Sequence, residues 1–138
     1  MNRILLTIFI SLSFITCLRA QQKINYRKVP LVDSAVGFAS FYSNSFIGKK
    51  TANGEIFSQS KMTCAHNTLP FGTQIRVTNL ENEKFVVVRV NDRLHHRNSR
   101  LVDLTSSAAK ELEFKGKGVI KVRVEVIRAS ESQISPPK

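Results

Sequence analysis

Three side chains that can carry protons lie within about 40 residues of one another in this chain. Glu55 follows the turn-forming pair Asn53-Gly54, His66 precedes a Leu-Pro-Phe-Gly turn, and Asp92 ends an apolar run. Carboxyl and imidazole groups are the acid–base groups that sugar-polymer chemistry uses. Loops on a rigid β-scaffold can bring such distant side chains to one groove, so the pattern predicts a shared acid–base site.

Each of these residues also has a structural interpretation that the sequence leaves open. Glu55 could be an exposed loop glutamate, and His66 could be a structural histidine with satisfied hydrogen bonds. Asp92 could be held ionised by the neighbouring Arg93, or it could be partly buried and serve as a general acid. Composition and spacing do not choose between these roles.

Other chemistries have weaker support in the sequence. His95 and His96 would point in opposite directions on an extended chain, so we do not expect them to share a metal ion. Without zinc spacing, a glycine-rich phosphate loop or a serine nucleophile elbow, we expect neither a metal nor a cofactor. Cys64 is expected to be a small buried residue, with a nucleophilic role beside His66 as the alternative. Four aromatic residues could stack on sugars or belong to the core, namely Phe41, Tyr42, Phe46 and Phe71.

The first 20 residues have the features of a secretory signal. Arg3 gives a positive start, residues 4–15 are mostly apolar, and Ala20 supplies a small residue at the expected cut. The alternatives are an uncleaved membrane anchor and lipidation at Cys17, which lacks the usual small residue ahead of it. We expect export to the periplasm or cell envelope, or secretion, without stable membrane insertion after cleavage.

The remaining chain is long enough for one domain. We expect a flexible arm over residues 21–34, the domain over 35–128 and a disordered tail over 129–138. The chain has 21 basic and 10 acidic residues, a formal net charge of +11. This charge favours anionic polymers, and export argues against nucleic acid. The basic residues are spread along the chain, which also fits an ordinary soluble surface.

Hydrophobic patterning predicts a mainly β domain. Strands are expected over residues 36–42, 74–78, 84–90 and 120–126, and the second and third should form a hairpin with a loop of four or five residues. A short apolar segment covers 101–104. Thr105 is a candidate N-cap for a helix over 106–114. The pattern fits a closed β-barrel or a β-sandwich and does not decide between them.

Five segments in series resemble the RlpA (rare lipoprotein A) family of bacterial cell-envelope proteins, over about residues 36–127. They are Gly37-Phe38-Ala39-Ser40-Phe41-Tyr42, Gly48-Lys49-Lys50-Thr51-Ala52-Asn53-Gly54-Glu55, Ala65-His66-Asn67-Thr68-Leu69-Pro70-Phe71-Gly72-Thr73, Val88-Arg89-Val90-Asn91-Asp92-Arg93 and Arg100-Leu101-Val102-Asp103-Leu104-Thr105. The resemblance implies a six-stranded double-psi β-barrel, as in the first domain of expansins, with one or two short helices. It also implies binding to peptidoglycan glycan strands. Independently of the resemblance, we expect a monomer.

The implied activity is lytic transglycosylation of the bond between N-acetylmuramic acid and N-acetylglucosamine, with a 1,6-anhydro product. The family pattern makes Asp92 the general acid, while Glu55 and His66 would orient the sugar and tune Asp92. The substrate-binding residues would be Tyr42, Thr51, Asn53, Phe71 and Arg93.

The chain departs from the family pattern beside the expected acid. The family usually continues Asp-Arg with Gly-Pro, whereas Leu94-His95 follow here, and Cys64 replaces a usual alanine. A non-catalytic, expansin-like polysaccharide-binding module is therefore the alternative function. A structural or inhibitor-like envelope protein that has lost its groove is a third, which retention of Glu55, His66 and Asp92 disfavours.

Overall fold

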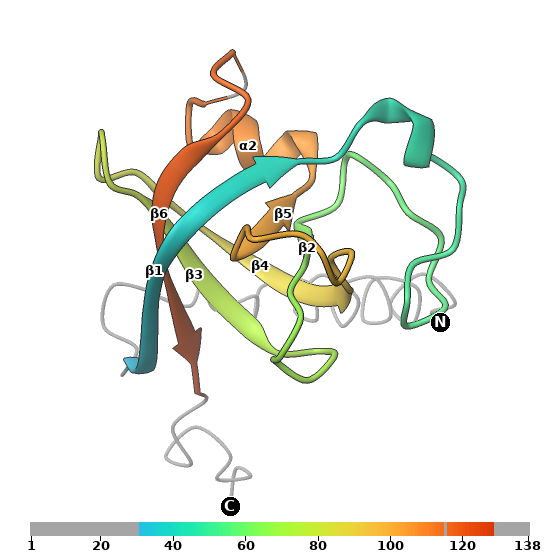
Figure 1. Ribbon diagram of the computed structural model, residues 1–138, viewed down its shortest axis with the longest axis horizontal. Coiled ribbons are helices and arrows are strands. Elements are labelled where there is room, and N and C mark those ends of the chain that lie inside the picture. Colours follow the sequence, from blue (N-terminus) through green and yellow to red (C-terminus); the bar gives the residue numbers. More distant parts are fainter. Residues whose placement is uncertain (1–30, 115, 129–138) are drawn as a thin grey trace, which may run out of the picture.

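The computed structural model describes residues 31–114 and 116–128, so the predicted signal, the predicted tail and residues 21–30 of the predicted arm lie outside the described residues. Six strands close into a barrel in the order β1-β5-β2-β4-β3-β6 (Figure 1). The strands are β1 Leu31–Phe41, β2 Thr63–Ala65, β3 Gln74–Asn79, β4 Phe85–Asp92, β5 Val102–Leu104 and β6 Ile120–Ile127. The helical elements of the described part are a 3-10 turn, η2 (Asn44–Phe46), and a helix, α2 (Ser106–Glu111).

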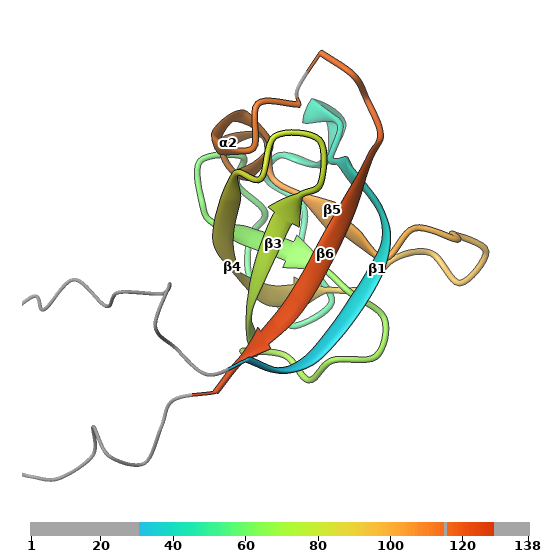
Figure 2. The ribbon, with the colours of Figure 1, turned by 90° about the vertical axis from the view of Figure 1, so that its left-hand side faces the viewer.

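Parallel and antiparallel pairings are mixed around the barrel. β3 pairs antiparallel with β4 and β6, and β6 pairs antiparallel with the long strand β1, as Figure 2 shows side-on. On the other side, β1 runs parallel to β5 and β2 runs parallel to β4, while β2 and β5 are antiparallel. Closure removes the free sheet edges that an open sheet would expose. The expected six-stranded barrel is thus confirmed, and the sandwich is wrong.

The core follows from the alternation along the strands. Inward-facing residues of β3, β4 and β6 are almost fully buried, namely Ile75, Val77, Val86, Val88, Val90, Ile120, Val122 and Val124. Thr105 begins α2 as its N-cap, since its hydroxyl accepts from the N–H of Ala108. Ala108, Ala109 and Phe114 then close one side of the core. Each buried Val, Ile or Phe contributes about 1.5–3 kcal/mol relative to exposure, so this cluster is the main source of stability.

Two element boundaries differ from the predictions, and one strand was not predicted. β1 begins at Leu31 rather than at residue 36, because it pairs with β6 along its length. α2 ends at Glu111, short of residue 114, and Glu113 has the left-handed φ of 56° that follows a helix end. β2 was not predicted as a separate strand. Its three residues are all buried and show no alternation, so they carry no period-two signal.

The strand register places one residue from each of four neighbouring strands side by side across the barrel wall. Ser40 of β1 lies opposite Asp103 of β5, Asp103 lies opposite Ala65 of β2, and Ala65 lies opposite Asp92 of β4. The candidate site lies along this row, which consists of Ser40, Asp103, Ala65 and Asp92. Within the described residues, no helix is long and apolar enough to cross a membrane.

Candidate active site

Asp92 is the last residue of β4, and its half-buried carboxylate accepts three hydrogen bonds. The Tyr42 hydroxyl donates to Oδ2 at 2.7 Å, while the backbone N–H groups of Ala52 and Arg93 donate to Oδ1, each at 2.8 Å. None of the ion pairs found among residues 31–114 and 116–128 involves Asp92. The carboxylate is therefore fixed in position by neutral donors, without a cation to neutralise it.

A β-bulge directs the end of β4 toward this site. One step along β2, from Cys64 to Ala65, corresponds to two steps along β4, ending at Asp92. Bulges reorient side chains and are frequent beside active sites. As a result, Asn91 and Asp92 both reach the loop of residues 51–55, through hydrogen bonds to Glu55 and to the Ala52 N–H respectively.

The loop of residues 51–55 is a tight turn held by its own backbone. The Thr51 N–H donates to the Glu55 carbonyl at 2.8 Å, and the Gly54 N–H donates to the Thr51 carbonyl at 2.9 Å. Gly54 has a φ of 90°, which a glycine adopts without the steric cost of a side chain. The buried Thr51 hydroxyl donates to Asn53 Oδ1 at 2.7 Å. This turn presents the Ala52 N–H to Asp92.

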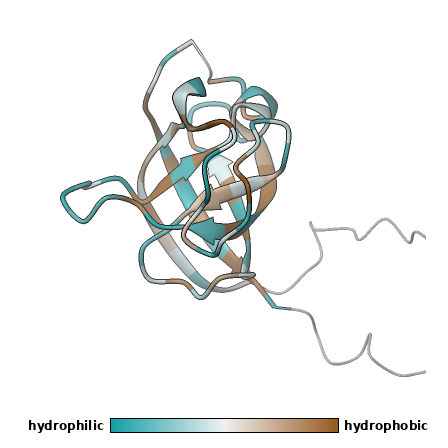
Figure 3. Ribbon diagram, turned by 90° about the vertical axis from the view of Figure 1, so that its right-hand side faces the viewer, coloured by the Kyte–Doolittle hydropathy of each residue, from teal (hydrophilic) through white to brown (hydrophobic). Residues whose placement is uncertain are grey.

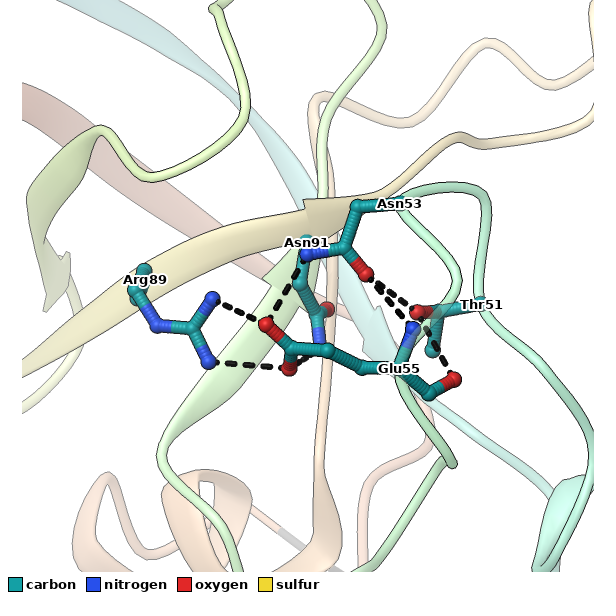
Figure 4. A network of polar contacts seen from close by, with 5 residues as sticks. All are labelled: Thr51, Asn53, Glu55, Arg89 and Asn91. Carbon is teal, nitrogen blue, oxygen red and sulfur yellow. Dashed lines mark hydrogen bonds and ion pairs between the residues drawn. The ribbon is translucent and has the colours of Figure 1, made fainter.

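Glu55 is held by four protein hydrogen bonds, as Figure 4 shows. Arg89 binds both carboxylate oxygens, at 2.7 and 2.9 Å, in a bidentate ion pair. Asn53 donates to Oε1 at 2.9 Å and Asn91 donates to Oε2 at 3.1 Å. The hydrogen bonds from Arg89, followed by those from the two amides, lower the pKa of Glu55 to about 2. Glu55 is therefore ionised at neutral pH, and its acceptor positions are used by the protein.

His66 lies directly after β2 and is buried beside Asp92. Its backbone N–H donates to the Asp92 carbonyl at 3.1 Å. The imidazole Nδ1 accepts from the backbone N–H groups of Thr68 and Leu69, both at 3.3 Å, so the neutral ring carries its proton on Nε2. Burial, and then the positive charge of Arg93, lower the pKa of His66. At neutral pH this residue is a hydrogen-bond donor through Nε2.

Arg93 bridges His66 and Phe71. Its guanidinium donates from Nη1 to the His66 carbonyl at 2.6 Å and lies 3.9 Å from the centre of the exposed Phe71 ring. Cation–π stacking of this kind holds an arginine flat against an aromatic face. Arg93 therefore does not hold the Asp92 side chain in an ion pair, contrary to the structural alternative that the sequence left open.

Asp103 is a second carboxylate in the same row across the strands. Arg100 binds it in a bidentate ion pair, with Nε to Oδ1 at 2.6 Å and Nη2 to Oδ2 at 2.8 Å. The carboxylates of this region are therefore of two kinds, which differ in their hydrogen-bond partners. The carboxylates of Glu55 and Asp103 each form a bidentate ion pair with an arginine. The Asp92 carboxylate instead accepts hydrogen bonds from one hydroxyl and two backbone N–H groups.

The structure brings all eight residues selected from the sequence into one connected region. Phe71 contacts Arg93, Arg93 contacts His66, and His66 contacts Asp92. Asp92 in turn contacts Tyr42 and the loop that contains Thr51, Asn53 and Glu55.

Sequence reasoning missed three groups, Arg89, Asn91 and the Ala52 N–H. Arg89 and Asn91 lie two residues apart on β4, a spacing that places them on the same face of a strand. The occurrence of these two polar residues in an otherwise apolar run was the signal that could have identified them. The role of the Ala52 N–H depends on backbone conformation and leaves no signal in residue type.

Three remaining predictions concern residues near this region. Cys64 is fully buried, as expected, and burial raises the pKa of its thiol. Phe41 packs edge-on against Phe114 in the core, so the four aromatic residues do not form one sugar-stacking platform. The rings of His95 and His96 lie 4.2 Å apart, which contradicts the expected opposite directions, because the chain turns here rather than extending.

The segment that carries these histidines projects from the barrel and is hydrophilic, as Figures 2 and 3 show. Leu94, at the position where the resemblance led us to expect glycine, is buried. No group of three or more His, Cys, Asp or Glu side chains in the described ranges could hold a metal ion.

The closed six-stranded barrel with mixed parallel and antiparallel pairing places the fold in the double-psi β-barrel class. A family model described as "Lytic transglycolase" matches residues 34–124. The chain belongs to this family, that of the RlpA-like double-psi β-barrel proteins.

Relatives named endolytic peptidoglycan transglycosylase RlpA are close in sequence. The protein from Campylobacter jejuni is 46% identical over 99 residues, which cover 72% of this chain and 36% of the relative. The Pasteurella multocida protein is 47% identical over 67% of this chain and 31% of its own length, and the Pseudomonas aeruginosa protein is 49% identical over 67% and 27%. The chain thus spans about a third of the length of these relatives.

Solved structures share the fold at low sequence identity. A Streptomyces papain inhibitor superposes with a TM-score of 0.58 at 18% identity, covering 72% of this chain and 99% of the inhibitor. The expansin of Clavibacter michiganensis, without ligand, gives a TM-score of 0.56 at 21% identity, covering 76% of this chain and 54% of the expansin. These likenesses concern the barrel only.

Proposed function

We propose that this protein is a peptidoglycan-cleaving lytic transglycosylase that acts on glycan strands at the bond between N-acetylmuramic acid and N-acetylglucosamine. The observation that carries the proposal is the contrast among three carboxylates. Glu55 and Asp103 are bound bidentately by arginines, whereas Asp92 is positioned by neutral donors alone. The relatives that share the domain are named for this activity.

Asp92 would act as the general acid and then as the base. It gives its proton to the glycosidic oxygen as the bond from that oxygen to C1 of the muramic acid breaks. The C6 hydroxyl oxygen of the same sugar then bonds to C1, and its proton returns to Asp92. The product is a 1,6-anhydro ring, and the enzyme ends in its starting protonation state. Positioned proton transfer of this kind typically contributes ~10²–10⁴ in rate.

A single available carboxyl group suits this chemistry better than hydrolysis. Hydrolytic glycosidases use two carboxyl groups, of which one must act as a base toward water or as a nucleophile. Glu55 and Asp103 are poor candidates for that second role, because their oxygens already accept charged hydrogen bonds. Lytic cleavage does not need a second carboxylate, since the sugar supplies the attacking hydroxyl.

The neighbouring residues would bind and orient the glycan. His66 could donate from Nε2 to a sugar hydroxyl or acetamido oxygen, because its Nδ1 is occupied. The Arg93 guanidinium could bind a carboxylate of the muramic acid, and the exposed Phe71 ring could pack against a sugar face. Thr51, Asn53 and Glu55 would maintain the turn that supports Asp92, rather than touch the reacting atoms.

The export predictions belong with this function. A substrate in the cell envelope requires the protein to leave the cytoplasm, which fits a signal over residues 1–20 and cleavage near Gln21. The sequence before Cys17 does not favour lipid anchoring. We therefore propose that the protein acts in the periplasm or cell envelope, or is secreted; the monomeric state stays a prediction.

The decisive experiment is digestion of purified, stem-stripped peptidoglycan by the wild-type protein and by Asp92→Asn, with mass spectrometry of the soluble products. We expect anhydro-muropeptides from the wild type and a loss of at least about 10²-fold in the variant. Products with reducing ends in place of anhydro ends would show hydrolysis and contradict the mechanism. Binding of glycan by both proteins without any soluble product would favour the expansin-like alternative.

A further inference from the structure

Tyr42, predicted from the sequence as a substrate-binding residue, directs its hydroxyl at the candidate acid. It follows β1, and its hydroxyl lies 2.7 Å from Asp92 Oδ2. Its ring packs against Phe57, with centroids 4.4 Å apart, and against Phe46, at 5.5 Å. The Tyr42 N–H donates to the Leu104 carbonyl at 2.9 Å, so backbone and ring are both held. The hydroxyl is thus fixed by the fold.

The two oxygens of Asp92 are not equivalent. Oδ1 accepts from the backbone N–H groups of Ala52 and Arg93, and an amide N–H can only donate. A proton on Oδ1 would have to displace one of these donors. Oδ2 faces the Tyr42 hydroxyl alone among the described hydrogen bonds, so it retains a position for a proton. The geometry therefore makes Oδ2 the oxygen that can carry the transferable proton.

We propose that Tyr42 is a positioning residue that selects Oδ2 of Asp92 as the proton-carrying oxygen and stabilises the carboxylate formed when this proton is given to the substrate. The inference rests on the function proposed above. A hydroxyl donates a stronger hydrogen bond to a carboxylate than to a neutral acid. The contact between Tyr42 and Asp92 therefore strengthens as the proton leaves, so that it favours the transition state over the starting complex.

In this scheme Tyr42 keeps its own proton throughout. Burial, and then the hydrogen bond to Asp92, raise the pKa of the Tyr42 hydroxyl, which opposes its ionisation. The transferred proton moves from Asp92 Oδ2 to the glycosidic oxygen, and the proton of the sugar C6 hydroxyl later returns to Oδ2. Tyr42 forms no bond to the substrate in either step.

The charged and titratable groups around Asp92 come from three directions. Arg93 follows it on the chain, and His66 lies on the segment after β2. Asp103 on β5, paired with Arg100, is close enough to Tyr42 to contribute to its raised pKa. Tyr42→Phe leaves these groups in place and removes only the hydroxyl, which makes it the appropriate variant.

The test combines a titration with kinetics on the full protein. The Asp92 carboxyl is followed by ¹³C NMR in the wild type, in Tyr42→Phe and in Phe46→Leu, which changes the packing around the ring but keeps the hydroxyl. We expect the titration midpoint to be higher in Tyr42→Phe than in the wild type, because a hydrogen bond that favours the carboxylate is lost, and to stay at the wild-type value in Phe46→Leu. On stem-stripped glycan, kcat of Tyr42→Phe should fall about tenfold with little change in KM.

Two results would overturn the inference. An unchanged midpoint in Tyr42→Phe would show that the hydroxyl does not stabilise the carboxylate. A raised KM with unchanged kcat would return Tyr42 to the role of a substrate-binding residue. Failure of the proposed function is distinguishable, because it appears as a wild-type protein that yields no anhydro products, whereas the titration still decides what Tyr42 does to Asp92.

Discussion

The carboxylates of Glu55 and Asp92 are connected through Asn91 and the turn of residues 51–55, yet they have different hydrogen-bond partners. Glu55 has an arginine and two amides, and Asp92 has a hydroxyl and two backbone N–H groups. The residue types and their spacing placed both in the site without separating their roles, and only the family resemblance assigned the general acid to Asp92. Arg89 and Asn91 are 34 and 36 residues from Glu55, so the pairing depends on strand register, which residue type does not encode.

The ion pair of Glu55 predicts a pH-dependent stability. Its folded-state pKa is lowered to about 2, below the ordinary value of 4.5, so its contribution is present above about pH 4.5 and is lost as the pH falls toward 2. Urea unfolding across this range should show a falling free energy of unfolding, and Glu55→Gln should reduce that slope. At neutral pH we expect Glu55→Gln to lower stability by about 1 kcal/mol, a modest value because the pair is partly exposed.

Glu81→Gln is the matched control for this measurement, because Glu81 pairs with Lys117 at the surface, where both side chains are about half exposed. Removing its charge should leave the acid-range slope close to that of the wild type. A Glu55→Gln protein with the full wild-type slope would contradict the assignment of this pH dependence to Glu55.

His66 leads to a prediction about tautomer and charge. Because Nδ1 accepts two backbone hydrogen bonds, ¹⁵N NMR at pH 7 should find a neutral imidazole with the proton on Nε2. Its lowered pKa means that stability is retained above the unfolded value of 6.5 and decreases as the pH falls below it, since unfolding then takes up a proton. An imidazolium at pH 7, or an Nδ1–H tautomer, would be incompatible with this arrangement.

At the scale of elements, the strands with clear alternation were predictable and the short ones were not. The hairpin of β3 and β4, with residues 80–84 as its loop, and the strand β6 match the sequence predictions closely. β2 has three buried residues, and its parallel partner β4 lies more than 20 residues away along the chain. Such non-local parallel pairing, and the bulge that it contains, arise from closure of the barrel rather than from any local pattern.

We expect the conformation of the turn of residues 51–55 to depend on Gly54. Gly54→Ala has room for its methyl group, but the φ of 90° is unfavourable for alanine and should cost about 1–2 kcal/mol or shift the turn. Because this turn supplies the Ala52 N–H, we expect a lower melting temperature together with reduced lytic activity. Gly116→Ala is the control, since Gly116 has equal space and lacks a left-handed φ. Equal effects of the two substitutions would exclude strain in the turn as the cause.

At the scale of the whole molecule, one continuous core supports the barrel and the site together. The cluster includes residues from all six strands and from α2, with no division into separate cores within residues 31–114 and 116–128. A barrel of this kind should unfold in one cooperative transition. The site row of Ser40, Asp103, Ala65 and Asp92 crosses four of these strands, so its geometry depends on the integrity of the whole barrel rather than on one loop.

The net charge of +11 leads to a prediction about substrate capture. A basic protein should associate with an anionic wall polymer partly through long-range attraction, which salt screens over a Debye length of about 8–10 Å at 0.1–0.15 M. Binding of Asp92→Asn to stem-stripped peptidoglycan, measured by co-sedimentation so that cleavage does not interfere, should weaken several-fold between 0.05 and 0.5 M NaCl. Chitin, which offers N-acetylglucosamine without carboxylates, is the matched ligand, and any binding to it should change little with salt. If binding to the two polymers responded equally to salt, attraction to the carboxylates would not be the cause, and recognition would have to come from hydrogen bonds and stacking at the site itself.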